Sequence, residues 1–261
     1  MIHGIVDHLV ETGDTVPPSL RAITCGSSGI AAPLLARAHD VLGADLHQGH
    51  GMTELAGNVV FLGPEEHRRG LAGEPHLLTF AGRPGPGVEV RLLDDDAHEV
   101  PVGEGGEVVV RGEQVTPGYW EAPEADAKAF VDGAWLRTGD VGCFDEQGLL
   151  SIVDRKKDII VSGGENVSSR AVEDALAAHP AVAEVAVVGA PDEHWGELVC
   201  AFVVPRAESD VIADEVLAFA REVDGGFQQP RRVLLVDVLP RNATGKVLKH
   251  ELRARLGAEG R

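Results

Sequence analysis

The spacing of hydrophobic residues gives the first part of the chain an alternating pattern of strands and helices. A short apolar run at residues 20–25 is typical of a buried strand, and residues 45–47 predict a second one. Between them, residues 33–42 repeat apolar positions at helical spacing. Pro33 favours the first turn of this helix, and Gly43 is placed to end it.

The pattern changes near Gly82 to short β segments separated by turn-forming residues. The sequence predicts strands at 88–93, 107–111 and 149–153, and a helical stretch at 121–130.

The pattern of apolar and polar residues changes again after Asp154. A helix is predicted from Val167 through Ala178, with Ser168 as its N-cap and Pro180 just beyond its end. The remaining predictions are strands at 182–188, 198–204 and 233–236, and helices at 211–223 and 247–256. This is typical of an α+β unit with its own core. We therefore expect two domains, residues 1–156 and 157–261, joined near 155–158.

Composition narrows the classes of function. The 42 acidic residues outnumber the 23 Lys and Arg, and a net charge of −19 argues against nucleic acid or an anionic membrane as a partner. The three cysteines lack metal-binding or redox spacing. The N-terminal residues lack the features of a signal peptide, and no window has the length and apolarity of a membrane span. We expect a cytoplasmic protein without a membrane span.

The first candidate for chemistry is the segment 48–54, Gln-Gly-His-Gly-Met-Thr-Glu, which follows a predicted strand. Glycines allow a backbone to approach a ligand closely. The Thr53 hydroxyl is suited to bind a phosphate, and the Glu54 carboxylate is suited to hold Mg²⁺ between phosphate oxygens. The alternative, favoured when the segment is taken alone, is a tight turn capped by Thr53.

The second candidate is Asp140, at the end of the loop-like segment 135–140. Its carboxylate is suited to accept two ribose hydroxyls, in charge-assisted hydrogen bonds worth about 1.5–3 kcal/mol each. The alternative is a β-turn in which Asp140 is an ordinary turn residue.

Two basic segments follow. Residues 154–158, Asp-Arg-Lys-Lys-Asp, precede a predicted strand and a glycine pair, and the alternative reading is a solvated run of charges. Lys246 follows Thr-Gly before a helix, where a cation is mildly unfavourable against the helix dipole. It is not part of a P-loop, because Pro240 and Val247 stand where that loop needs a glycine and a hydroxyl residue.

Other chemistries find no support in the sequence. His47 and His50 are three residues apart but have no cysteine or acid partners at zinc-binding spacing, so we do not expect a zinc site. There is no nucleophile elbow and no dinucleotide-binding glycine fingerprint.

The order of these motifs resembles the carboxyl-terminal half of the adenylate-forming acyl-CoA synthetases, an AMP-binding enzyme family that includes fatty-acyl and aryl-acid CoA ligases. Essentially the whole chain takes part, with further landmarks at 82–84, 106–108 and 195–197. The resemblance implies an α/β remnant of the large AMP-binding domain over residues 1–156, a sheet with helices plus a small β-barrel-like part. A small mobile α+β cap domain would follow over residues 157–261.

The resemblance also implies roles for individual residues. Thr53 would bind phosphate, Glu54 would bind Mg²⁺, and Lys246 would assist adenylation. Lys157 would be the hinge about which the cap domain rotates. Further residues that would contact the nucleotide are Ser28, Gly29, His50, Gly51, Met52, Asp140 and Arg155. Gly163 and Gly164 would lie beside the pantetheine tunnel of CoA.

The implied reaction has two steps. A carboxylic acid, fatty or aryl, attacks ATP to give acyl-AMP and pyrophosphate, and the thiol of CoA then displaces AMP. The implied small-molecule partners are therefore the acid, ATP/AMP, CoA and Mg²⁺.

Two departures from the family pattern affect this expectation. The family's Ser/Thr/Gly-rich triphosphate loop lies upstream and is absent here, so we expect the chain alone not to reach a normal adenylation rate. His50 stands where the family usually has a tyrosine that stacks on adenine. The alternative function is a non-catalytic AMP- or CoA-binding or interaction module, a split or truncated product. We also expect a homodimer, or a partner chain that supplies the missing half, through an apolar face in residues 1–60.

Overall fold

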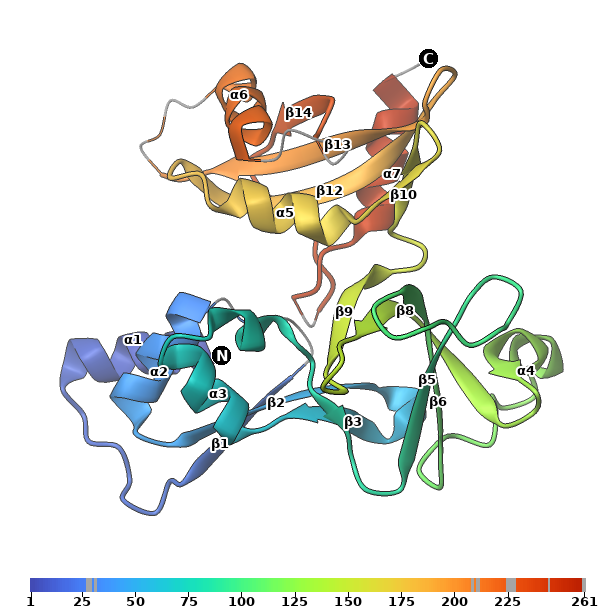
Figure 1. Ribbon diagram of the computed structural model, residues 1–261. Coiled ribbons are helices and arrows are strands. Elements are labelled where there is room, and N and C mark those ends of the chain that lie inside the picture. The colour runs from blue at the N-terminus through green and yellow to red at the C-terminus, as the bar shows by residue number, and fades with distance from the viewer. Residues whose placement is uncertain are drawn as a thin grey trace. The chain divides into compact units, whose positions relative to one another are not determined.

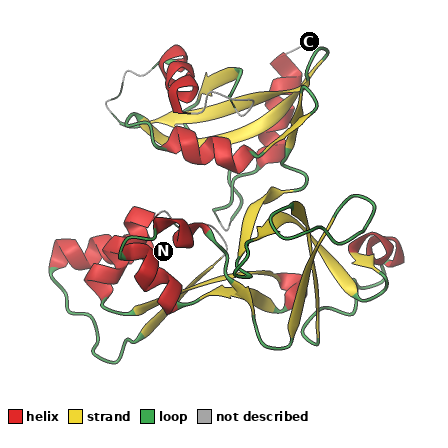
Figure 2. Ribbon diagram, viewed as in Figure 1, coloured by secondary structure: helices red, strands yellow, loops and turns green. Residues whose placement is uncertain are grey.

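The computed structural model of the protein describes residues 1–26, 30, 32–207, 209, 212–223, 229–243 and 245–259. The chain forms two compact units, Met1–Ile152 and Val153–Arg261. Figure 1 traces both units along the chain, and Figure 2 distinguishes their helices and strands. The mixed α/β and α+β class that the sequence predicts is confirmed. The two units divide after Ile152, whereas domains of residues 1–156 and 157–261 stay a prediction.

The first unit begins with a sheet of strand order β1-β2-β3-β4. Its strands are β1 (Ala22–Gly26), β2 (Asp45–Met52), β3 (Gly57–Leu62) and β4 (Arg83–Pro84). Strand β1 is parallel to β2, which is antiparallel to β3. The helices of this part gather on one side of the sheet (Figure 1): α1 (Ile2–Thr12), α2 (Ala32–Leu42) and α3 (Pro64–Leu71).

The second sheet of this unit has the order β5-β6-β8-β7, with β9 paired to β8. Its elements are β5 (Val88–Leu93), β6 (Gly105–Gly112), α4 (Pro123–Ala129), β7 (Phe130–Val131), β8 (Trp135–Phe144) and β9 (Leu150–Arg155). One buried cluster joins both sheets, since Val59 and Val60 of β3 pack with Val108, Leu136 and Leu150. The two sheets therefore share a core, and residues on β2 and β8 are held in a fixed relation.

The second unit is a sheet of order β11-β10-β13-β12, with β14 paired to β13. Its strands are β10 (Ile160–Ser162), β11 (Glu165–Val167), β12 (Val182–Asp192), β13 (Gly196–Pro205) and β14 (Arg232–Leu235). Its helices are α5 (Ser169–Ala177), α6 (Ala213–Val223) and α7 (Lys249–Glu259).

Both faces of the β12–β13 ladder are apolar, because successive side chains of a strand point to opposite sides. Val187 and Ala201 pack with Leu176 of α5 and Val216 of α6. The intervening positions of these strands pack with α7, as Phe202 does against Leu252 and Leu256. The near-continuous apolar sequence of these strands is thus the result of burial on both faces.

The helix predicted after Val167 is confirmed together with its cap. The Ser168 hydroxyl accepts a hydrogen bond from the backbone N–H of Ala171 at the start of α5. Two other predictions differ in length from the elements found. The helix expected at 121–130 is the shorter α4, whereas the strand expected at 45–47 is only the beginning of the longer β2. No helix in the described ranges is long and apolar enough to cross a bilayer.

The shared core of the first unit generates a stability prediction. Val108 is 1% exposed, whereas Val102 of the same unit is 64% exposed. Val108→Ala removes two buried methyl groups and leaves a cavity, so we expect the free energy of unfolding of this unit to fall by about 2 kcal/mol. Val102→Ala is the matched control and should change it by less than about 0.5 kcal/mol. Urea denaturation measures both, and equal effects would contradict the described core.

Candidate functional site

In the first unit, the candidate residues meet where β2 approaches β8. His50 lies on β2 and Asp140 on β8. The His50 Nε2 and Asp140 Oδ2 atoms are 3.1 Å apart, and the two side chains are 25% and 5% exposed. The sequence predicted both residues near a nucleotide, and the fold brings them into direct contact.

Local structure at Asp140 differs from the sequence prediction. Residues 135–140 were expected as a loop, but they lie within β8. The backbone N–H of Asp140 donates to the Thr138 hydroxyl at 3.1 Å, and that hydroxyl donates to the carbonyl of Val108 on β6 at 2.8 Å. Gly139 between them has a φ of 72°, in the left-handed region that favours glycine. The Thr-Gly-Asp sequence therefore makes an irregular strand that presents a buried carboxylate.

Most of the segment 48–54 is a strand, whereas the alternative reading was a tight turn. Strand β2 continues through Met52, and a short 3₁₀ turn begins only at Thr53 and ends at Leu55. Gly51 is required by packing, since a Cβ there would lie 1.9 Å from the carbonyl oxygen of Gly57. Met52 packs against the shared core. Gly51 and Met52 thus have architectural roles, and their contacts with a nucleotide stay a prediction.

Thr53 is exposed, and Glu54 is half-buried beside a residue that the sequence analysis missed. The Tyr119 hydroxyl donates to Glu54 Oε1 at 3.0 Å, and the backbone N–H of Thr116 donates to the Glu54 carbonyl at 2.8 Å. Burial, and next the neighbouring Glu54 carboxylate, raise the pKa of the Tyr119 phenol. The contact between Tyr119 and Glu54 spans 65 residues, so a local sequence pattern could not predict it. The turn-forming glycine before Tyr119 was the only local signal at this position.

Ser28 and Gly29, predicted to lie against adenine, fall outside the described residues. In the part of the chain that is described, no three His, Cys, Asp or Glu side chains group as a metal site. Mg²⁺ is usually held by one or two carboxylates plus substrate phosphates, and Glu54 as one such carboxylate stays a prediction.

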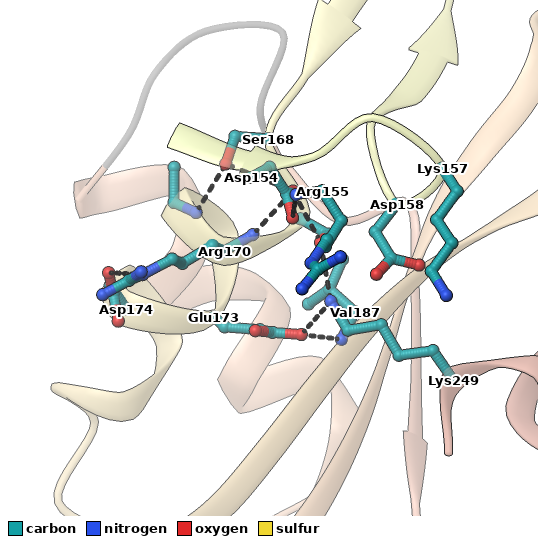
Figure 3. Close-up of polar contacts among 12 residues, drawn as sticks. Asp154, Arg155, Lys157, Asp158, Ser168, Arg170, Glu173, Asp174, Val187 and Lys249 are labelled. Atoms are coloured by element: carbon teal, nitrogen blue, oxygen red, sulfur yellow. Dashed lines mark hydrogen bonds and ion pairs between the residues drawn. The ribbon is translucent and has the colours of Figure 1, made fainter. Parts of the chain in front are cut away.

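The second unit carries Arg155, whose backbone is held by a buried aspartate. Asp154 is 7% exposed, and its Oδ2 accepts from the Ser169 hydroxyl at 2.8 Å and from the backbone N–H of Arg170 at 3.3 Å. Its Oδ1 accepts from the Arg155 N–H at 2.7 Å. Figure 3 shows this carboxylate at the start of α5, where a helix N-terminus favours negative charge.

Lys157 is exposed in the next turn, in which the Asp158 N–H donates to the Arg155 carbonyl at 2.8 Å. Arg253 of α7 donates to the Lys157 carbonyl at 3.2 Å and to Asp158 Oδ1 at 2.6 Å. The segment 154–158, for which a solvated run of charges was the alternative reading, is therefore tied to α7 through its backbone and one carboxylate, while the Lys157 side chain is exposed.

A half-buried ion pair lies beside this segment (Figure 3). Lys249 Nζ is 2.8 Å from Glu173 Oε1, and the side chains are 17% and 22% exposed. Lys249 also donates to the Ser169 hydroxyl at 2.6 Å, and Glu173 accepts the Val187 N–H at 2.8 Å. Burial raises the pKa of the Glu173 carboxyl, and the nearby Lys249 opposes that rise. The pair connects α7, α5 and β12, and the sequence analysis did not anticipate it.

The remaining candidate residues of the second unit are the glycine pair, Gly163 and Gly164, and Lys246. Gly163 and Gly164 have φ values of 62° and 87°, and the Gly163 N–H donates to the Trp195 carbonyl at 2.8 Å. A Cβ at Gly163 would lie 2.9 Å from the Trp195 ring. Both positions therefore require glycine for conformation or space.

Lys246 is exposed and follows a closed turn. Its N–H donates to Asn242 Oδ1 at 2.9 Å, and the Arg241 guanidinium donates to the Gly245 carbonyl at 2.5 Å. Arg241 also pairs with Glu184 of β12 at 2.6 Å. The turn is thus anchored to the sheet of its own unit, with the lysine side chain accessible to a ligand.

Comparison with known proteins places the chain in a family. Residues 1–120 match the family model described as AMP-binding enzyme, and residues 171–246 match the one described as AMP-binding enzyme C-terminal domain. The chain belongs to the AMP-binding, adenylate-forming enzyme family.

Individual relatives agree with that placement. The chain is 42% identical to a feruloyl-CoA synthase of an Amycolatopsis species over 92% of this chain and 47% of the relative. It is 39% identical to a medium/long-chain-fatty-acid–CoA ligase of Mycobacterium tuberculosis, over 98% of this chain and 44% of the relative. The chain spans about half the length of the curated relatives it matches.

A solved structure shares the fold as well as the sequence. The o-succinylbenzoate coenzyme A synthetase of Bacillus subtilis, in complex with ATP and magnesium ion, is 33% identical with a TM-score of 0.81. The match covers 97% of this chain and 50% of that one.

The Glu173–Lys249 pair generates a prediction for the second unit. Lys249→Met leaves the Glu173 carboxylate buried without a cation, so we expect the unfolding free energy to fall by about 3–5 kcal/mol at neutral pH. The native pKa of Glu173 should rise further in this variant, so its native state binds a proton more tightly than its unfolded state. The loss should therefore shrink as the pH falls toward the ordinary carboxyl range.

Denaturant unfolding from pH 8 to pH 5 measures this dependence. The control is Arg170→Met, which breaks an exposed pair with Asp174, where the side chains are 43% and 76% exposed. Exposed pairs contribute about 0–1 kcal/mol, so this variant should be nearly neutral. A loss in Lys249→Met that does not vary with pH would contradict the role of the buried carboxylate.

Proposed function

We propose that this chain carries the AMP-binding face and the adenylation lysine of an ATP-dependent acyl-CoA ligase. The observation that carries the proposal is the buried Asp140 carboxylate, held at 3.1 Å from His50 beside the strand that leads into Thr53 and Glu54. These are the residue types that ribose hydroxyls, a phosphate and Mg²⁺ require, placed on elements of one shared core.

In the proposed first step, a carboxylate oxygen of the acid attacks the α-phosphorus of ATP. A new P–O bond forms, the bond to the β-phosphate breaks, and pyrophosphate leaves. Asp140 orients the nucleotide through its ribose, and Thr53 donates to a phosphate oxygen. Lys246 stabilises the charge that develops at the transferred phosphate, an effect whose loss typically costs about 10²–10³-fold in rate. Mg²⁺, held through Glu54, would neutralise phosphate charge when bound.

In the proposed second step, the sulfur of CoA attacks the acyl carbon of acyl-AMP. The thioester bond forms, the bond from the acyl carbon to the phosphate oxygen breaks, and AMP leaves, while the thiol proton passes to solvent. Gly163 and Gly164 would lie along the pantetheine, because two glycines leave the backbone open to close approach. Lys157 would be the pivot between the steps, since its side chain is exposed in a turn next to the unit boundary.

The proposed acid is aryl or fatty. Similarity to a feruloyl-CoA synthase and to a fatty-acid–CoA ligase supports both classes. The proposed partner, a second copy or a chain that supplies the other half of the ligase, would cover apolar residues such as Ile5 and Val10 on α1, which are exposed.

The nucleotide part of this proposal is tested by calorimetry. We expect AMP to bind the chain and Asp140→Ala to weaken binding at least about tenfold, because it removes charge-assisted hydrogen bonds to ribose. Asp40→Ala is the control, since Asp40 is an exposed aspartate on α2 of the same unit. No binding heat at millimolar AMP, with folded protein, would count against the proposal.

The chemical step is tested by acid-dependent exchange of pyrophosphate into ATP, with panels of aryl and fatty acids. The chain alone is expected to exchange below a normal rate, and we expect Lys246→Ala to lower that residual rate about 10²–10³-fold further. Lys128→Ala is the control, because Lys128 is an exposed lysine on α4. If the unmodified chain binds AMP but exchanges with no acid, it acts as an AMP- or CoA-binding module in place of a ligase.

A further inference from the structure

The turn that carries Lys246 is a small hairpin closed by its own backbone. The N–H of Lys246 donates to Asn242 Oδ1 at 2.9 Å, and its carbonyl accepts the Asn242 N–H at 2.9 Å. Next to this pair, the Leu248 N–H donates to the Pro240 carbonyl at 2.8 Å. Both polar groups of the Lys246 backbone are therefore engaged, and the lysine side chain starts from a point that moves only with the hairpin.

Arg241 joins this hairpin to the sheet of the second unit. Its Nη1 donates to the Gly245 carbonyl at 2.5 Å, and its Nη2 donates to Glu184 Oε2 on β12 at 2.6 Å. One planar guanidinium thus holds the residue before Lys246 and a distant strand at the same time. We propose that Arg241 is a positioning residue, which fixes the Lys246 backbone relative to β12 for adenylation. The inference rests on the proposed function, because Lys246 is there the group that stabilises the transferred phosphate.

The alternative is an ordinary surface ion pair that only stabilises the fold. The Arg241 and Glu184 side chains are 40% and 45% exposed, and pairs as open as this contribute little to overall stability. The flanks of the hairpin are held in another way, since Leu239 is buried and Val247 packs against the same apolar cluster. Loss of Arg241 should therefore free the tip of the hairpin while the unit stays folded, and this difference separates positioning from stabilisation.

The position of the hairpin matters because a lysine side chain is long and flexible. Its ammonium group stabilises a developing charge only when it is held close to that charge, and a misplacement of about 1 Å can cost about 10²-fold in rate. The hydrogen bond from Arg241 acts on the peptide of Gly245, the residue type with the greatest backbone freedom. Fixing that peptide limits the directions in which the Lys246 side chain can start.

Substitutions at both ends of the link test the role in the exchange of pyrophosphate into ATP. Arg241→Met removes both hydrogen bonds, so we expect the maximal rate to fall about tenfold while the KM for ATP stays within about twofold. Glu184→Gln keeps an acceptor and should retain most of the rate, whereas Glu184→Leu should behave as Arg241→Met does. Arg170→Met is the matched control, because it breaks a pair with Asp174 in which Arg170 is 43% exposed, and it should leave the rate unchanged.

A double variant decides whether Arg241 acts through Lys246. In the Lys246→Ala background, followed with radiolabelled pyrophosphate, Arg241→Met should lower the rate by less than about twofold, because the group that it positions is gone. A further tenfold loss in that background would overturn the proposal, and so would an unchanged rate in Arg241→Met alone. Thermal unfolding of Arg241→Met should stay within about 3 °C of the unmodified chain. A larger fall would make Arg241 a stability residue instead.

Hydrogen exchange of backbone amides tests the link without any activity. In the ligand-free chain, Arg241→Met should speed exchange at the Gly245 and Lys246 amides about tenfold, while the amides of β12 and β13 keep their rates. Equal exchange at Gly245 and Lys246 in both proteins would refute the link. If these amides respond but the unmodified chain exchanges pyrophosphate with no acid, the proposed function fails while the anchoring of the hairpin by Arg241 stands.

Discussion

Carboxylates that are wholly or partly removed from water need hydrogen-bond donors or cationic partners beside them, and such partners are found in both units of the protein. Asp140 is reached by His50 from another sheet, Asp154 by the first turn of α5, and Glu173 by Lys249 of α7. Each acid would be costly to bury alone, so each one fixes the relation between elements that are distant in sequence. The candidate ligand residues Asp140, Arg155 and Lys157 lie on segments that these carboxylates hold in place.

Sequence reasoning was most successful where the determining interaction is local. The N-cap at Ser168 involves a residue three positions away, and helices α2 and α6 follow from apolar periodicity within one segment. Sequence reasoning was wrong where pairing with a distant strand determines the secondary structure. Residues 48–52 and 135–140 contain several glycines and polar residues, which favour loops, yet they pair along β3 and β6. Ladder partners far along the chain override local propensity.

Predictions for the candidate site also succeeded for local features and failed for long-range contacts. The motifs identified the candidate residue types, but they did not identify the contacts of His50 with Asp140, or of Tyr119 with Glu54, or of Lys249 with Glu173. Each contact spans tens of residues and depends on which side chains the folded core brings together. Family membership is shown by similarity over the chain, whereas the role of each residue toward ATP, CoA and an acid stays a proposal.

The two-faced sheet of the second unit has a consequence for how the protein is made. Strands β12 and β13 can bury one face as soon as α5 and α6 are present, since these helices precede β14 in the chain. The other face, with Phe202 and Cys200, is covered by α7, which is translated only after β14. A nascent chain that ends between β14 and α7 therefore exposes an apolar sheet surface to the ribosome exit and to neighbouring chains, where such surfaces promote aggregation. Chaperone dependence during synthesis should concentrate in that interval.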